Sequence, residues 1–173
     1  MTRRETQQGS SSGADWRDGH AWSPERLVAA IEFLTRRVEA DFEEITATLP
    51  GRPLVMRPDL AWADDSRVPG TTPGPEDVIA VLFDGQHEFP AGLEDGVEYA
   101  CFVVADRMQD DVIDMLGRPW PELFAPSGES MGVLDPRYAG GLALWTLRGE
   151  ALCAIGQLVG AVAAAGLGLV NPI

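Results

Sequence analysis

The sequence predicts an α+β fold, in which an antiparallel sheet of about four to five strands is packed by two long helices in the order α-β-β-β-α-β-β. Two stretches with apolar residues at helical spacing predict the helices, and short apolar runs around turn signals predict the strands. The 173 residues are 45% hydrophobic and 23% charged, which are ordinary values for one globular domain.

Composition divides the chain into three segments. Residues 1–22 are polar and contain the triplet Ser10-Ser11-Ser12, so we expect a flexible N-terminal tail. Residues 23–156 should form the single α+β domain, and residues 157–173 an apolar C-terminal tail rich in Ala and Gly. The N-terminus has no apolar signal region, and the two cysteines have no ligand or pairing pattern. We therefore expect a cytoplasmic protein with free thiols.

The first helix has a clear beginning. Ser23 is a favourable N-cap and Pro24 suits the first helical position. Helical spacing then continues to Pro50-Gly51 through Leu27, Ile31, Leu34, Val38, Phe42, Ile45 and Leu49. This apolar seam predicts packing on the rest of the domain, with a dimer contact as the alternative.

The strands before the second helix come from weaker patterns. Residues 53–62 alternate weakly around Pro58, which predicts an edge strand, and residues 63–77 read as a loop. The apolar run 77–83 and the segment 86–89 flank Asp84-Gly85, a strong hairpin signal.

The second helix is predicted over residues 95–117. Asp95 is a candidate N-cap with Glu98 completing a capping box, and Gly117 suits the left-handed position after the last turn. One face is apolar: Val97, Cys101, Val104, Met108, Val112 and Met115. Beyond it, residues 119–141 read as an irregular crossing, and residues 142–147 and 151–155 as a second hairpin.

Charge is the strongest functional signal. The net charge is −14, and residues 76–150 hold fifteen acidic residues against four Arg, a balance of −11. Such a charge disfavours nucleic acid and favours a basic partner. The second helix carries an acidic row at i, i+4 spacing, and the candidate partner-binding residues are Asp106, Asp110, Asp111 and Asp114.

Two motifs match those of known enzyme classes, but each lacks other residues that the reaction requires. Gly128-Glu129-Ser130-Met131-Gly132 matches the serine-hydrolase elbow, but no histidine follows Ser130 as the general base. Asp110-Asp111-Val112-Ile113-Asp114 matches a Mg²⁺-diphosphate motif, yet that chemistry needs a second aspartate-rich helix. We therefore predict no catalytic residue, no metal and no cofactor.

The run 151–170 is apolar apart from Gln157 and nearly long enough for a bilayer. Its Gly156, Gly160, Ala164 and Gly168 fall every four residues, as in membrane-helix contacts. Its Ala and Gly residues insert weakly, and no basic residue follows it. Packing on the domain or in an oligomer is favoured, with a membrane tail anchor as the lesser alternative.

The block 77–155 combines the Asp84-Gly85 hairpin, a helix reading ADRMQDDV, the segment Trp120-Pro121-Glu122 and a final hairpin. In this it resembles a scattered group of small uncharacterised actinobacterial proteins. The resemblance implies the strand–helix–strand order and no known activity. Similar sequences often have a cysteine and histidines after W-P-E, where this chain has Leu123-Phe124-Ala125-Pro126, so a metal site does not carry over.

These observations together predict a non-catalytic acidic interaction protein, adaptor- or immunity-like, that binds a basic protein partner. The alternative is a subunit of a homo-oligomer or larger assembly that uses the Ala/Gly-rich C-terminus and the first helix.

Overall fold

The computed structural model describes residues 22–46, 59–62, 74–82 and 87–169. The predicted N-terminal tail falls outside these residues except for Trp22. The elements of the first part are α1 (Pro24–Thr46), β1 (Asp59–Trp62), β2 (Val78–Leu82), β3 (His87–Pro90) and α2 (Val97–Leu116). Those of the second part are β4 (Glu122–Phe124), β5 (Ser130–Ala139), β6 (Leu142–Leu147), β7 (Glu150–Ala154) and α3 (Leu158–Ala164).

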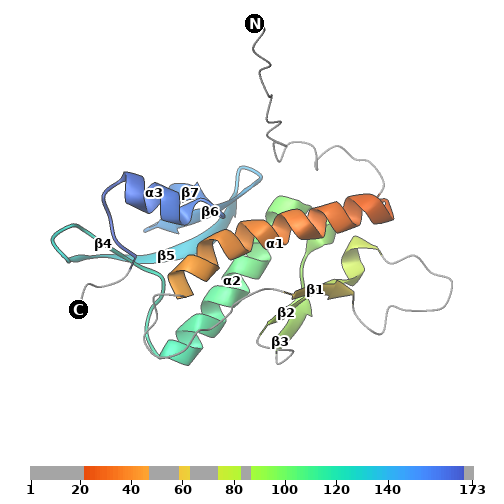
Figure 1. Ribbon diagram of the computed structural model, residues 1–173, viewed down its shortest axis with the longest axis horizontal. Helices are drawn as coiled ribbons and strands as arrows, with labels where there is room; N and C mark the ends of the chain where they lie inside the picture. The colour runs from red at the N-terminus through yellow and green to blue at the C-terminus, as the bar shows by residue number, and fades with distance from the viewer. Residues whose placement is uncertain (1–21, 47–58, 63–73, 83–86, 170–173) are drawn as a thin grey trace, which may run out of the picture.

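The strands form two antiparallel sheets, β1-β2-β3 and β4-β5-β6-β7 (Figure 1). The α+β class, the two long helices and the opening order α-β-β-β-α are therefore confirmed. The division into two sheets differs from the single sheet that the sequence suggested. The three strands before α2 pair with one another, and the four strands after α2 form the second sheet.

Helix α1 begins as predicted. The Ser23 hydroxyl accepts a hydrogen bond from the backbone N–H of Arg26 at 3.3 Å, which satisfies one of the free donors of the first turn. Of the described seam residues, Leu27, Leu34, Val38 and Phe42 are buried in the domain's own core, and Ile31 is half-buried and packs against it. The side chains that would continue the seam at residues 45 and 49 lie outside the described part.

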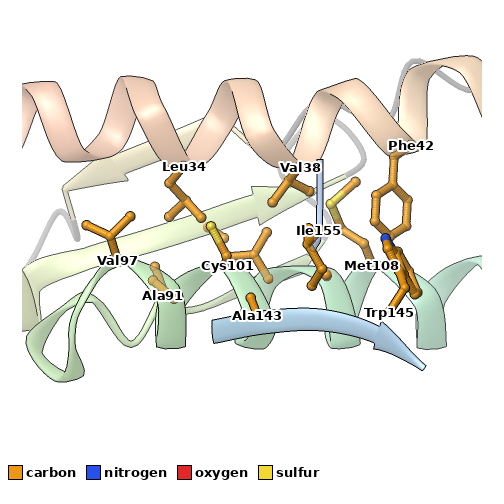
Figure 2. Packing of buried hydrophobic residues seen from close by; sticks show 14 of the residues in the cluster. Leu34, Val38, Phe42, Ala91, Val97, Cys101, Met108, Ala143, Trp145 and Ile155 are labelled. Carbon is orange, nitrogen blue, oxygen red and sulfur yellow. The ribbon is translucent and has the colours of Figure 1, made fainter. Parts of the chain in front are cut away.

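The core lies between the helix layer and the sheets. Figure 2 shows Leu34, Val38 and Phe42 of α1 pointing toward α2 and β6, and the Phe42 ring lies 5.9 Å from that of Trp145. The predicted apolar face of α2 is confirmed at the positions whose side chains are described: Val97, Cys101, Val104, Met108 and Val112 are at most 2% exposed.

The start of α2 corrects the sequence prediction. Its N-cap is Gly96, with φ 104°, and no side chain caps it, while Asp95 ends a short 3-10 helix, η4 (Leu93–Asp95). Glu98 is therefore not part of a capping box, and its carboxylate turns into the core. The end of α2 is as predicted, because Gly117 adopts the left-handed conformation and its N–H donates to Ile113.

The two predicted hairpins are present. Strands β2 and β3 pair with Leu82 opposite His87, although the turn between them lies outside the described residues. Strands β6 and β7 pair with Leu147 opposite Glu150. Arg148 and Gly149 both have positive φ there, as a two-residue hairpin turn requires.

Strands β4 and β5 correct the prediction of an irregular crossing over residues 119–141. β5 is ten residues long despite Gly132 and Pro136. The Leu134 N–H donates to Pro121 on the β4 side, so the Pro136 nitrogen, two residues on, faces the same side. Because β4 pairs only with residues 130–133, Pro136 lies on a free edge and interrupts no ladder bond.

The C-terminal segment packs on the domain. Leu158 and Val162 of α3 belong to the same core cluster as α1, and Gly168 pairs with Phe124 of β4. The described residues 151–169 are thus divided between strand β7, a turn, a seven-residue helix and the segment that follows it. In the described ranges, no helix has the length and apolarity needed to cross a membrane.

Candidate functional site on helix α2

Helix α2 places the candidate partner-binding residues away from its buried face. Asp110 and Asp114 are exposed, while Asp106 and Asp111 are half-buried. Residues two positions from buried Met108 are turned about 200° around the helix, so Asp106 and Asp110 point to the opposite side. Asp111 lies at the flank of this row. We call Asp106, Asp110 and Asp114 the acidic row.

The electrostatics of the acidic row show mutual repulsion. Burial raises the pKa of Asp106 above its ordinary value of 3.8, and the negative charge of Asp110 raises it further. Arg107 and Arg137 oppose the shift without cancelling it. Residues 106–114 hold four carboxylates and one guanidinium, so the surface keeps an excess of negative charge that a cationic group would relieve.

The D-D-x-x-D motif does not build a metal centre in the described part of the chain. No group of three His, Cys, Asp or Glu side chains lies close enough there to hold a metal ion. Among the described elements, no second aspartate-rich helix lies against residues 110, 111 and 114.

Ser130 does not lie in a nucleophile elbow. It is the exposed first residue of β5, in the hairpin that joins β4 to β5, and its hydroxyl donates to the carboxylate of Glu122. An elbow needs a sharp turn from strand into helix, and here a strand follows another strand. The G-x-S-x-G match therefore reflects a glycine-rich turn.

No sequence pattern predicted the buried carboxylate of Asp41 in α1, which is 1% exposed. Its oxygens accept hydrogen bonds from the Trp145 indole N–H at 2.7 Å, the Leu158 N–H at 2.8 Å and the Gly156 N–H. Burial raises its pKa, while these three bonds and the nearby Arg37 act in the opposite direction. Asp41 thus joins α1 to β6 and to the start of α3.

A second buried polar group joins α1 and α2. Arg37 forms an ion pair with Glu98 and donates through Nε to the Ile155 carbonyl at 3.0 Å. The other Glu98 oxygen accepts from the Ala143 N–H at 2.9 Å. Every buried side-chain polar atom in the described part has a partner, so these groups are engaged in holding the elements together.

A shallow groove of about 410 Å³ lies between α1 and α3 beside Asp41. Its walls are mostly small or apolar: Ala40, Asp41, Gly156, Gln157, Val159, Gly160 and Ala161. Both Asp41 oxygens already accept hydrogen bonds from the chain, so the groove offers no free acid or base.

The two thiols are not activated. Burial raises the pKa of Cys101 to about 12 and that of Cys153 to about 11. Both thiols therefore stay protonated at neutral pH, and a protonated thiol is a poor nucleophile and metal ligand.

No protein-family model, curated protein or solved structure matches this chain. The resemblance to small actinobacterial proteins and the cytoplasmic location therefore stay predictions.

Proposed function

We propose that the protein is a non-catalytic interaction protein that binds a basic protein segment through the acidic row of α2. The supporting observations are the −14 net charge, the exposure of Asp110 and Asp114, and the i, i+4 spacing that aligns the row over two helical turns. The outward position of the row leaves its carboxylates accessible to a partner.

The observation that best supports the proposal is that Asp110 and Asp114 are exposed one helical turn apart beside Asp106, whose pKa is raised by burial and then by the charge of Asp110. A carboxylate held near a like charge is destabilised in its ionised form, and an approaching guanidinium or ammonium group removes that penalty. Complementary charge of this kind mainly sets the association rate and the choice of partner. The chemical class of partner is therefore an Arg- or Lys-rich segment.

The experiment measures binding of a labelled oligoarginine peptide by fluorescence anisotropy at low ionic strength. The test variant combines Asp106→Asn, Asp110→Asn and Asp114→Asn. We expect the dissociation constant to rise about tenfold, because the local charge is lost, and binding to weaken as salt is added.

The matched control combines Glu94→Gln, Glu129→Gln and Glu150→Gln, which removes three charges from exposed positions elsewhere. The control should change the dissociation constant by less than about threefold. Equal losses in the two variants would mean that the peptide senses only net charge, which would contradict a specific binding row.

A further inference from the structure

Three aromatic side chains gather where the first half of α2 meets β5. The ring centroid of Tyr99 lies 5.9 Å from that of Phe102 and 5.4 Å from that of Tyr138 on β5, whose ring stands edge-on to it. Tyr138 is 43% exposed, and the other two side chains are half-buried. We call these three rings the aromatic cluster. Exposed tyrosines are typical of contact surfaces, because an apolar ring there carries a polar end.

The aromatic cluster continues the acidic row along α2. Residues 99, 102 and 106 follow one another at intervals of four or fewer, which places them on one side of the helix. Asp106 lies one turn after Phe102 and two turns, about 10 Å, after Tyr99. One side of α2 thus changes from aromatic in its first half to acidic in its second half.

The charge next to the aromatic cluster is negative. Arg137 and Asp135 of β5 act in opposite directions on the pKa of Asp106. Residues 106–114 of α2 keep four carboxylates against the single guanidinium of Arg107. Among the described residues, no arginine of the chain itself lies over the three rings of the aromatic cluster. The rings and the neighbouring carboxylates together therefore suit a cation that a partner supplies.

Rings beside carboxylates discriminate between the two common basic side chains. A guanidinium group is planar and weakly hydrated, so it stacks on aromatic faces and also forms paired hydrogen bonds with a carboxylate. The ammonium group of lysine is a strongly hydrated point charge and gains less from a ring. In an extended peptide, alternate side chains lie about 7 Å apart, so arginines two positions apart can reach the rings and the acidic row together.

On the basis of the proposed binding by the acidic row, we infer that the partner segment is rich in arginine rather than lysine. One guanidinium stacks on the aromatic cluster, and another pairs with Asp106 and Asp110. The acidic row attracts any basic segment, and the aromatic cluster adds the preference for arginine. A cation–π contact at an exposed site contributes a factor of about two to five in affinity.

The test compares labelled oligoarginine and oligolysine peptides of equal length by fluorescence anisotropy at low ionic strength. Tyr138→Leu removes the exposed ring and should raise the dissociation constant of oligoarginine about two- to fivefold. The dissociation constant of oligolysine should change by less than about 1.5-fold, which also shows that the variant is folded. Tyr138→Phe keeps the ring and should bind both peptides as the wild type does.

The triple Asp→Asn variant separates this inference from the proposed function. If that variant weakens both peptides while Tyr138→Leu changes both equally or neither, the acidic row remains the binding site and the preference for arginine is overturned. A loss of oligoarginine binding in Tyr138→Phe as large as in Tyr138→Leu would also overturn it, because the ring would then not be the cause. If the triple variant weakens neither peptide, the proposed function fails and the inference fails with it.

Discussion

Asp41 and Trp145 are 104 residues apart in the chain, and the indole N–H of Trp145 donates to the Asp41 carboxylate at 2.7 Å. The same carboxylate accepts from the backbone of Gly156 and Leu158. One side chain of α1 thereby fixes the position of β6 and of the chain entering α3. These hydrogen bonds hold together the elements of the domain that support α2, the helix that carries the acidic row.

Replacing Asp41 should destabilise the fold strongly. Asp41→Ala leaves three buried N–H donors without an acceptor, and each costs about 1–3 kcal/mol. We expect the free energy of unfolding to fall by about 3 kcal/mol or more in urea denaturation. Glu32→Ala, at an exposed position of the same helix, should change it by less than about 0.5 kcal/mol. Equal effects would contradict the structural role of Asp41.

Asp41 should also make stability depend on pH. Burial raises its folded pKa above the ordinary 3.8, so its contribution is largest below pH 3.8 and is lost as pH rises through the folded pKa. Relative to Asp41→Asn, which cannot titrate, the wild-type chain should lose stability over that interval. Urea unfolding of both proteins from pH 3 upward measures the difference. A wild-type advantage that instead grows with pH would show that the three hydrogen bonds outweigh burial.

The coupling within the acidic row can be measured directly. Asp110→Asn removes the neighbouring charge that raises the pKa of Asp106, so that pKa should move toward 3.8. Titration of the Asp106 carboxyl by carbon-detected NMR reports the value. Glu94→Gln should leave it where it is. If the pKa of Asp106 is the same in Asp110→Asn as in the wild type, the two residues do not interact as the row requires.

Gly156 should be intolerant of a side chain for two reasons. Its φ is 91°, and an added Cβ would lie 2.9 Å from the Arg37 carbonyl oxygen. Gly149 provides a matched comparison, because its φ is 85° and nothing lies within 4 Å of an added Cβ. Gly149→Ala should lose about 1 kcal/mol from backbone strain, and Gly156→Ala clearly more. Similar losses in urea unfolding would mean that α1 does not approach the turn after β7 so closely.

Local patterns predicted the elements whose signals are contained in a few residues. Ser23-Pro24 and the seam of α1 are of this kind, and so are the hairpin predicted from residues 142–147 and 151–155 and the end of α2 at Gly117. β5 was missed because the Gly- and Pro-rich stretch that contains it, with Gly132 and Pro136, reads as irregular chain. The strand accommodates Pro136 because β4 is too short to pair with that part of β5, and this depends on the tertiary structure rather than on local sequence.

The partners of the buried polar residues are the part of the structure that local sequence patterns predicted least well. Glu98 fitted a capping box three residues after Asp95, but its partners are Arg37, 61 residues earlier, and Ala143, 45 residues later. A signal was present, since Glu98 lies among apolar residues at the start of α2 and Asp41 adjoins Phe42 of the seam. The acidic row, by contrast, was predictable because helical spacing alone decides which way it points.

The most direct test of the proposed function is an NMR titration of isotope-labelled protein with the oligoarginine peptide. We expect the amide shifts to concentrate on α2 around Asp106, Asp110 and Asp114 and to vanish in the triple Asp→Asn variant. Shifts spread evenly over exposed acids such as Glu94 and Glu150, or centred on another element, would contradict it.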